Sequence, residues 1–588
     1  MAHKPKDASA QGTTPSRAVF WAAAILLVAH MALGTLTIFS LSQTYDEAVH
    51  LASGYAFWRS GEYRVDAARN NPVARLFASL PLLRSNPDAF LQDSAYGQRS
   101  DFAYANRFLY SNRVPAETIL NTARLFLFLL ISPILGWITF RWAQEIAGSY
   151  AGLGALFLYA FNPTILSLAT LVTGDFTAAA LVFLCLYSFA KALRPDSRRL
   201  LMMLVAGLCL GLALGSKHSA AILLAVLPLS YSFHSYFLGR PILSKSAARE
   251  SLLIIFGALS ILALVYTPRQ LPLWWHGLYE TLSVAKGGGG HIAYLLGEIS
   301  GQGWWYYFPL AVLMKTPIPM ILLMTMPVWV RVGKMPEPQA RSELAFFLAL
   351  PAMLWLGAAC FSRFQIGIRH ILPIFPFCCV IGGVVLSHLW RMEGWKRGGA
   401  GLLLVWYAAG TLKIHPHHLA YFNEAVGGPA KGYKRLSDSN LDWGQGLKAL
   451  GALLKTEGNP PIYLSYFGTA DPHLYGIRYV PVALFCEFPR PGDAVEPFRA
   501  GKTLFAISAT NRVSTYYSDK RAMGWLDAYA PYKVLGHSLF VYDFTGQPEA
   551  LKHIAQILFM QGDQERARSI ARWWLKQPKP TDNTRLQP

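Results

Sequence analysis

The 588 residues are 53% hydrophobic and 15% charged, and the formal net charge is +20. A typical soluble protein has about 25% charged residues, so this composition argues against a soluble protein. The basic residues lie between apolar segments and form no single patch, which argues against nucleic acid as a partner. The six cysteines show no disulfide framework.

Apolar segments long enough to cross a membrane recur through the first 413 residues. A spanning helix needs about 20 mostly apolar residues. The first segment is too long for the apolar region of a cleaved signal peptide, and no clear cleavage site follows it, so we expect a retained helix. About eleven spans are predicted, at residues 18–41, 123–141, 150–168, 173–191, 200–216, 219–236, 250–268, 306–330, 343–361, 371–390 and 398–413.

Short loops rich in Lys and Arg set the orientation of these spans. With about eleven spans, all such loops lie on one side, which the positive-inside rule identifies as the cytoplasm. Lys191 and Arg331 belong to two of them. Three long segments then face the outside, at residues 42–122, at residues 269–305 and after residue 413. The predicted localisation is the cytoplasmic (inner) membrane, with membrane lipids around a multi-pass chain.

The chain after residue 413 has the pattern of a separate domain. Short apolar runs such as Ile462–Phe467 and Phe540–Phe544 indicate strands. Two amphipathic helices are predicted within residues 548–576. The predicted fold class is therefore mainly α, a polytopic helical membrane bundle with a C-terminal extracytoplasmic α/β domain. The predicted units are a disordered cytoplasmic N-terminus (1–17), a transmembrane domain (18–413), the α/β domain (414–547), and a helical hairpin with a disordered tail (548–588).

Acidic residues stand at the outer ends of two predicted spans. Asp46 and Glu47 follow the first span, with His50 one helical turn further on. Adjacent carboxylates at a membrane surface can supply a general base or metal ligands, and the alternative is the solvated start of a helix. Asp175 lies at the outer end of the fourth span. A carboxylate at the edge of the hydrocarbon indicates function, and its alternative is a helix N-cap.

Cations also stand at outer helix ends. Lys217, Arg369 and the neighbouring His370 lie there, and Lys315 lies about two turns into its span from the same side. Cations on the outer side run against the charge bias of membrane proteins. The phosphate of a lipid carrier would explain them through charge-assisted hydrogen bonds, and the alternative is snorkelling to lipid headgroups.

Two polar clusters follow the last predicted span. Histidines at residues 415–418 lack the partner spacing of a zinc finger, so metal binding is the less favoured interpretation. Within Ser437–Gln445, the side chains of Asn440, Asp442 and Trp443 can hydrogen-bond and stack on a sugar. The same residue types are also typical of a turn followed by a helix cap.

The motifs occur in a characteristic order. Asp-Glu follows the first span, Asn71-Pro72 lies in the long outer loop, and Gly174-Asp175 opens a later helix. Then come Gly-Leu-Ala-Leu-Gly-Ser-Lys, Lys-Thr-Pro-Ile-Pro and Ile-Arg-His-Ile-Leu-Pro-Ile-Phe-Pro, followed by His-Pro-His-His-Leu-Ala-Tyr-Phe-Asn-Glu and Ser-Asn-Leu-Asp-Trp-Gly-Gln. Over residues 18 to about 480 this order resembles glycosyltransferase family 39, the protein O-mannosyltransferase and lipid A aminoarabinose transferase group with the GT-C fold. The last two motifs are similar to a bacterial branch described as phospholipid-carrier-dependent glycosyltransferases.

The resemblance implies a polyprenyl-phosphate-linked sugar as donor and assigns roles to the candidate residues. Asp46 matches the base that activates the acceptor hydroxyl, with Glu47 as its companion, and Asp175 matches a second acidic position near the donor. The basic positions suited to the carrier phosphate are Lys217 and Arg369, to which we add His370 and Lys315. We assign sugar or acceptor contacts to His50, Asn440, Asp442 and Trp443. Asn70-Asn71-Pro72 stands where many relatives have His-Pro-Pro, which puts donor recognition by that loop in doubt.

The predicted function is transfer of a sugar from a polyprenyl-phosphate carrier to a protein, lipid or glycan acceptor at the outer membrane face. Such a reaction needs a base at the acceptor oxygen and positive charge on the departing phosphate. Whether the acidic residues also hold Mg²⁺ or Mn²⁺ stays open at this point. The alternatives are a transporter or flippase, a non-catalytic membrane assembly protein, and an enzyme that moves another lipid-linked group. The sequence shows no internal repeat of the kind that many transporters have, which argues against the transporter.

Overall fold

The computed structural model describes residues 15–66, 69–195, 198–288, 291–326, 337–483 and 495–576. The predicted disordered ends, Arg331 and one of the six cysteines lie partly or wholly outside these ranges.

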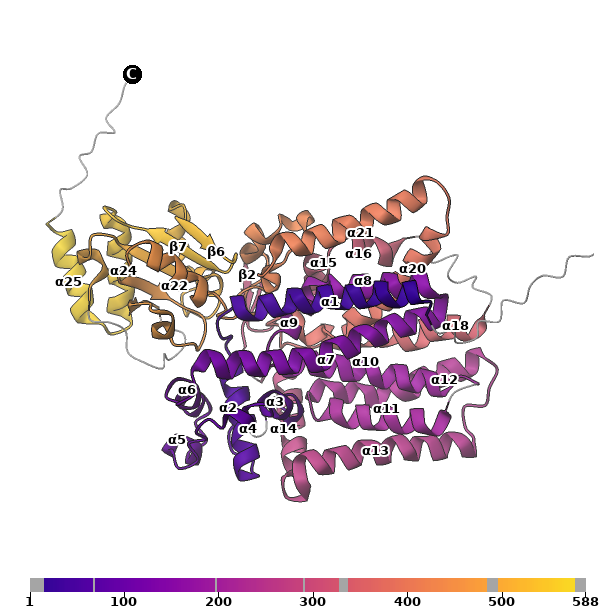
Figure 1. Cartoon of the computed structure of the whole chain (residues 1–588). Helices are drawn as coiled ribbons and strands as arrows, with labels where there is room; N and C mark the ends of the chain where they lie inside the picture. Colours follow the sequence, from indigo (N-terminus) through magenta and orange to yellow (C-terminus); the bar gives the residue numbers. More distant parts are fainter. Residues whose placement is uncertain are drawn as a thin grey trace, which may run out of the picture.

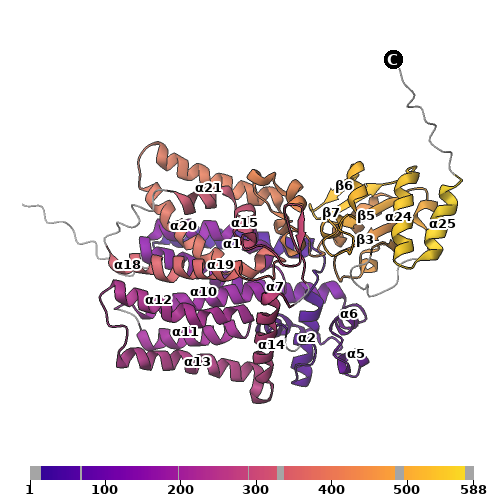
Figure 2. The same cartoon turned by 180° about the vertical axis from the view of Figure 1, so that it is seen from behind.

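Long apolar helices lie side by side in a bundle, and the C-terminal domain sits at one end of it (Figures 1 and 2). Six segments of the described chain are long and apolar enough to span a membrane. They are α1 (Arg17–Ser40), α7 (Ala116–Ala147), α10 (Gly174–Ala192), η1 with α12 (His218–Phe237), α13 (Lys245–Gln270), and α18 with η3 and α19 (Pro338–Cys360). The predicted membrane bundle is thus confirmed, and each of these six coincides with a predicted span.

Two further predicted spans are bent. α8 (Ser149–Ala160) and α9 (Pro163–Ala169) meet at 60°, and α15 (Tyr307–Lys315) and α16 (Ile318–Thr325) meet at 116°. Proline lies at or beside each break, where it cannot donate a helical hydrogen bond. Counting each pair as one span gives eight, fewer than the predicted eleven. The other three predictions fall on helices that are shorter or less apolar: α11 (Arg199–Leu214), α20 (Ile374–Trp390) and α21 (Trp395–Ile414).

Short helices cover the end of the bundle that carries the C-terminal domain (Figure 1). Most of them come from the long segment between α1 and α7, and the rest from the segment between α13 and α15. The helices are α2 (Glu47–Ser60), α3 (Pro72–Ser79), α4 (Leu82–Ser85), α5 (Ser94–Gly97), α6 (Asp101–Tyr110) and α14 (Pro272–Ser283). A hairpin of β1 (Ala293–Leu295) and β2 (Glu298–Ser300) follows α14. We call this the outer end, because the sequence predicts that these segments face the outside.

The C-terminal domain is built on a five-stranded sheet with the order β4-β3-β5-β7-β6. β3 is parallel to β4 and β5, and β7 is antiparallel to β5 and β6. Two of these strands, β3 and β7, are those expected from the sequence. The strands are β3 (Ile462–Ser465), β4 (Tyr479–Pro481), β5 (Leu504–Ser508), β6 (Lys533–Leu535) and β7 (Leu539–Asp543), and the helices are α22 (Leu447–Thr456), α23 (Ala509–Arg512), α24 (Pro548–Met560) and α25 (Gln564–Trp574). The predicted C-terminal α/β region is confirmed.

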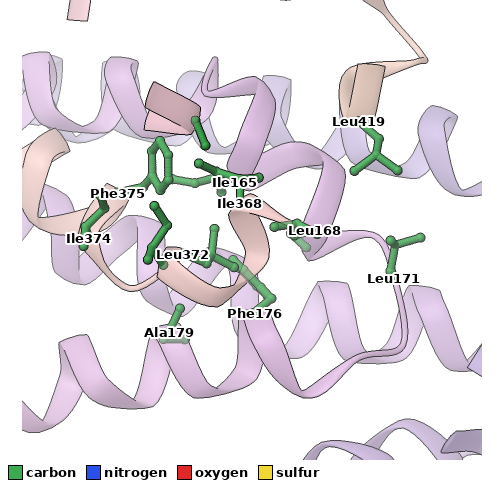
Figure 3. Close-up of a cluster of buried hydrophobic side chains, with 14 of the residues drawn as sticks. Ile165, Leu168, Leu171, Phe176, Ala179, Ile368, Leu372, Ile374, Phe375 and Leu419 are labelled. Carbon is green, nitrogen blue, oxygen red and sulfur yellow. The ribbon is translucent and has the colours of Figure 1, made fainter. Parts of the chain in front are cut away.

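An apolar cluster holds together the elements that carry the polar residues of the outer end. Figure 3 shows Phe176 and Ala179 of α10 close to Ile368 and Leu372, which flank Arg369 in the chain. These side chains are buried. Burying such side chains stabilises each by about 1.5–3 kcal/mol, so the cluster fixes the two segments relative to each other. The cluster also includes Ile165, Leu168, Leu171, Ile374, Phe375 and Leu419.

Candidate active site

Four charged side chains that are distant in sequence converge at the outer end of the bundle. Asp46 precedes α2, Asp175 lies in the first turn of α10, Lys217 precedes η1, and Arg369 lies in the short helix η4 (Ile368–Ile371). Arg369 Nη1 is 3.5 Å from Asp46 Oδ2 and 3.6 Å from Asp175 Oδ2. Lys217 Nζ forms an ion pair with Asp175 Oδ1. The structure therefore brings together the four residues that the resemblance assigned to the base, the second acid and the phosphate site.

A close backbone approach explains why Asp175 meets Lys217. A Cβ atom on Gly174 would lie 2.7 Å from the carbonyl oxygen of Ser216, so only glycine allows the two chains to come this near. The N-cap of α10 is Thr173. Asp175 is therefore not the cap that the sequence offered as its alternative, and it faces the cations instead.

The four side chains differ in their access to solvent. The side chain of Asp46 is 30% exposed, whereas that of Asp175 is only 4% exposed. Lys217 and Arg369 are intermediate, at 23% and 13%. Asp46 is thus the acid of the cluster that an incoming molecule reaches most easily, and Asp175 is neutralised within the protein.

The polar segment Ser437–Gln445 holds Arg369 in place. Its Nε donates to Ser439 Oγ at 3.1 Å, and its guanidinium lies 4.3 Å from the ring centre of Trp443. A Cβ on Gly367 would lie 2.2 Å from Ser439 Oγ, so this glycine admits the serine beside the arginine. Asn440 Oδ1 accepts from the backbone N–H of Ile368 at 3.0 Å. The segment is therefore a support for the arginine.

Asn440, Asp442 and Trp443, to which the sequence analysis assigned sugar contacts, bind other parts of the protein. Asn440 Nδ2 donates to Tyr307 Oη at 3.0 Å, and Asp442 Oδ2 accepts from Thr510 N at 2.9 Å. Burial raises the pKa of Asp442 to about 7. Asn440, Asp442 and Trp443 are all 2% exposed or less. Their contacts connect the C-terminal domain to Arg369 and leave little surface for a sugar.

Glu47 has a different environment from its neighbour Asp46. Its side chain and that of Arg124 are both 0% exposed and form an ion pair. Glu47 Oε1 accepts from Arg124 Nε at 2.8 Å and from Val172 N at 2.9 Å, and Oε2 accepts from Thr44 N at 2.8 Å. Both carboxylate oxygens are occupied by the protein, so this geometry favours a structural role over the predicted catalytic one.

Lys315 lies apart from the four-residue cluster. It is 2% exposed, and its Nζ donates to the backbone carbonyls of Leu419 at 2.7 Å and Asn440 at 2.5 Å. The ammonium also lies 4.5 Å from the ring centre of Phe422. These contacts position the Ser437–Gln445 segment, and they do not present Lys315 to a phosphate as the sequence prediction required.

Two histidines border the cluster. His370 Nδ1 is 3.5 Å from Lys217 Nζ, and its ring meets that of Phe364 at 4.7 Å. Burial and the nearby charges of Lys217 and Arg369 hold the pKa of His370 well below its usual range, so its ring is neutral. His50 is buried on α2, one turn after Asp46. Both therefore stay among the candidates for contact with a substrate.

The loop that departs from the family pattern is anchored on the bundle. Asn71 Nδ2 donates to the carbonyl of Leu214 at 2.5 Å, and Val73 N donates to that of Gly215 at 2.9 Å. The loop therefore reaches the turn that carries Lys217, although it lacks the His-Pro-Pro sequence.

No metal site is evident in the described chain. Among its residues, no group of three or more His, Cys, Asp or Glu side chains could hold an ion. His415 Nδ1 and His418 Nε2 lie 3.2 Å apart, a separation that two hydrogen-bonded neutral rings adopt.

Comparison with known proteins supports the family predicted from the motifs. A sequence model of the family described as dolichyl-phosphate-mannose-protein mannosyltransferase matches residues 120–269, about a quarter of the chain. Over this segment the chain is similar to that family. The matched region contains Asp175 and Lys217 of the cluster, together with Arg124. No curated protein matches the chain in sequence.

Two solved structures are distantly similar to this chain. ArnT from Cupriavidus metallidurans, bound to undecaprenyl phosphate, is 13% identical with a TM-score of 0.46, and the match covers 91% of this chain and 99% of that one. The archaeal oligosaccharyltransferase AglB from Archaeoglobus fulgidus, in complex with an inhibitory peptide and a dolichol-phosphate, is 10% identical with a TM-score of 0.43. Its match covers 68% of this chain and 56% of that one.

Sequence reasoning missed several residues that shape the site. Arg124, a charge at the start of a predicted span, should have drawn attention as the partner of an acid, since buried charges are paired. Ser439 carried no signal of its own, because its partner Arg369 is 70 residues away. Arg75, in the long outer loop, was also missed.

Proposed function

We propose that the protein transfers a sugar from a polyprenyl-phosphate carrier to an acceptor hydroxyl at the outer face of the membrane. The observation that carries this proposal is the position of Arg369 between Asp46 and Asp175, with Lys217 alongside. A partly exposed carboxylate can act as the base at the acceptor oxygen, and two neighbouring cations can stabilise the departing phosphate. The family match over residues 120–269 supports the same reaction class.

Asp46 is the proposed general base. The acceptor hydroxyl loses its proton to the Asp46 carboxylate while its oxygen attacks the anomeric carbon of the donor sugar. The bond from that carbon to the phosphate oxygen breaks, and its electron pair leaves with the polyprenyl phosphate. One carboxylate on the acceptor side is sufficient for such a direct displacement with inversion. Asp46 fits this position because its side chain is the most exposed of the cluster.

Arg369 and Lys217 are the proposed binding groups for the departing phosphate. The guanidinium contacts to Asp46 and Asp175 are longer than ordinary charge-assisted hydrogen bonds, which measure about 2.7–2.9 Å. N–H groups of Arg369 can therefore turn to a phosphate oxygen with little loss. Asp175 keeps the two cations together before the donor binds, since like charges at this separation would otherwise repel each other.

The finer aspects of this proposal follow from the predicted orientation. The site faces the extracytoplasmic side of the cytoplasmic membrane, and the donor enters from the surrounding lipid. We place Glu47 with the residues that position Asp46, because its own oxygens are bound by the protein. Asp175 already pairs with two cations of the protein, Lys217 and Arg369. We therefore propose a reaction that runs without a resident divalent metal in this cluster.

The test is sugar transfer or donor hydrolysis by the purified protein from a panel of polyprenyl-phosphate sugars. The Asp46→Asn variant should lose turnover by about 10²- to 10⁴-fold, the usual contribution of a general base. Donor binding should persist, because Asn keeps the size of the side chain and Arg369 is unchanged. Transfer that survives in Asp46→Asn would exclude Asp46 as the base.

A matched control is available in the same outer segment. Asp88 is an exposed carboxylate that pairs with Arg113 at 3.7 Å, and Asp88→Asn should leave turnover unchanged. No turnover of any donor by folded, lipid-supplied wild type, with full biological function in Asp46→Asn, would favour a transporter or an assembly protein instead.

A further inference from the structure

Arg75 of α3 lies outside the cluster described above and is only 1% exposed. We propose that it forms a binding site for an anionic group, a carboxylate or a phosphate, on the substrate of the transfer reaction. This inference rests on the proposed function for the identity of the reaction, but its own evidence is the geometry of Arg75.

The hydrogen bonds that the protein makes to the Arg75 guanidinium all use one nitrogen, Nη1. Nη1 donates to Ser53 Oγ at 3.1 Å and to the carbonyl of Asp66 at 2.9 Å, and it lies 3.5 Å from Asp66 Oδ2. The other two nitrogens, Nε and Nη2, are buried and have no hydrogen-bond partner in the described chain. Leaving buried donors of a charged group without a partner is costly, so a ligand is expected there.

The two unpaired nitrogens define the shape of that ligand. Nε and Nη2 lie on the same edge of a guanidinium and point their N–H bonds in parallel. That edge matches two oxygens of a carboxylate or a phosphate. A single hydroxyl would satisfy only one of the two nitrogens, so the free edge of Arg75 favours a bidentate anion.

The charge of Arg75 is also incompletely balanced. Its carboxylate neighbour Asp66 makes one long contact and accepts from Asn70 Nδ2 at 2.9 Å. Burial raises the pKa of Asp66 to about 7, against the pull of Arg75. Near neutral pH Asp66 is therefore only partly ionised, and a second negative charge would complete the neutralisation of the buried arginine.

The backbone of α2 connects this edge to the proposed base. Asp46, His50 and Ser53 are spaced by four and three residues, so they lie along one face of the helix. Ser53 holds Arg75, which places the arginine about 10 Å along the helix from Asp46. Burial lowers the pKa of His50, Asp46 raises it, and Arg75 lowers it again, so the middle residue senses both ends. A sugar unit of the donor or the acceptor can bridge this distance.

The crossing of α2 and α3 is rigid enough to hold such a site. A Cβ on Gly54 would lie 2.3 Å from the carbonyl oxygen of Arg75, so the two helices touch through their backbones. The Arg75 guanidinium also lies 5.3 Å from the ring centre of Tyr63. These contacts fix the arginine in place before any substrate arrives.

Binding measurements with matched sugars test the proposal without requiring turnover. In the first arm, short-chain polyprenyl-phosphate glucose and polyprenyl-phosphate glucuronic acid, which differ only at C6, are titrated into wild type and Arg75→Gln. In the second arm, methyl glucoside and methyl glucuronide are titrated into protein saturated with polyprenyl phosphate. Arg59→Gln is the control, because Arg59 is exposed and bonds Asn86 instead.

We expect wild type and Arg59→Gln to bind the acidic member about 10- to 100-fold more tightly in one arm, and Arg75→Gln to lose that preference. A preference in the first arm places the anion on the donor sugar, and one in the second places it on the acceptor. Equal binding of both members in both arms, or a preference that survives in Arg75→Gln, would overturn the proposal. If Arg75→Gln does not fold, Arg75→Lys, which keeps the charge but not the fork, should show a reduced preference. These outcomes are independent of the Asp46 assay.

Discussion

Ion clusters lie at both ends of the helical bundle, and they are built differently. At the end opposite the C-terminal domain, Arg194 binds Glu145 at 2.6 Å and Glu343 at 2.6 and 2.8 Å. At the outer end, Arg369 lies 3.5 Å from Asp46 and 3.6 Å from Asp175. Both arginines bridge two acids, but only the first makes short, bidentate contacts.

We infer from this difference that the Arg194 cluster is an internal clamp, whereas the Arg369 cluster is the proposed binding site. The Arg194 cluster joins α7, α10 and α18 and satisfies its charges within the protein. The Arg369 cluster joins equally distant segments but keeps donor groups that a phosphate can use. Charge burial and convergence are thus common to both clusters, and the proposed site differs from the clamp in its longer contacts and in the accessible Asp46 beside them.

The largest effect is expected from Glu47→Gln, which tests whether Glu47 belongs to the clamp type despite its position beside Asp46. The substitution leaves the guanidinium of Arg124 buried without its counter-charge. Removing one partner of a buried pair costs about 3–5 kcal/mol, so we expect little folded protein. Detergent-extracted yield and melting temperature measure this. A Glu47→Gln protein that is stable but inactive would return Glu47 to the catalytic role predicted from the sequence.

The same substitution at the two ends tests the comparison directly. Arg194→Gln leaves Glu343, whose side chain is 2% exposed, without its main partner, so stability should fall by about 3 kcal/mol while donor affinity is kept. Arg369→Gln should lower stability less than Arg194→Gln does, because its ion-pair contacts are longer and Lys217 still pairs with Asp175, and it should lower kcat/KM by about 100-fold, as expected for lost stabilisation of a leaving phosphate. The comparison fails if both variants show the same pattern.

The sequence predicted the bundle, the C-terminal α/β domain and a set of charged residues at one end of the spans, because each rests on a strong local pattern. Spans are defined by apolar length, and Asp175, Lys217 and Arg369 lie at helix ends where a charge is conspicuous. The prediction was less informative where a role depends on a distant partner. Asn440 and Trp443 looked suited to a sugar, yet their partners around Arg369 are about 70 residues away in the chain.

A smaller effect is expected from Ser439→Ala, which loosens Arg369 without changing any charge. Ser439 Oγ accepts from Arg369 Nε and donates to the carbonyl of Ile366 at 2.8 Å. Losing one hydrogen bond to a charged group is worth about 1.5 kcal/mol, so kcat/KM should fall by about 10-fold. A role in positioning the phosphate group predicts a lower kcat with nearly unchanged KM for the acceptor. Ser437→Ala, in the same segment, is the control and should retain activity.

The smallest effect is expected for the pH dependence of stability, through Asp442, which connects the Ser437–Gln445 segment to the C-terminal domain. Asp442 accepts from Thr510 N, and burial raises its pKa to about 7 in the folded protein. An unfolded Asp has a pKa of about 3.9, so between these values the folded state binds more protons than the unfolded state. Stability must therefore decrease as pH rises through that window.

Melting temperatures measured from pH 5 to 8 should fall by about 2 to 4 °C in wild type. Asp442→Asn, which keeps one acceptor and does not titrate, should flatten this slope, and the exposed control Asp519→Asn should not. An unchanged slope in Asp442→Asn would assign the pH dependence elsewhere, with the buried Asp66 and Asp438, whose pKa values burial raises to about 7 and about 6, as the next groups to replace.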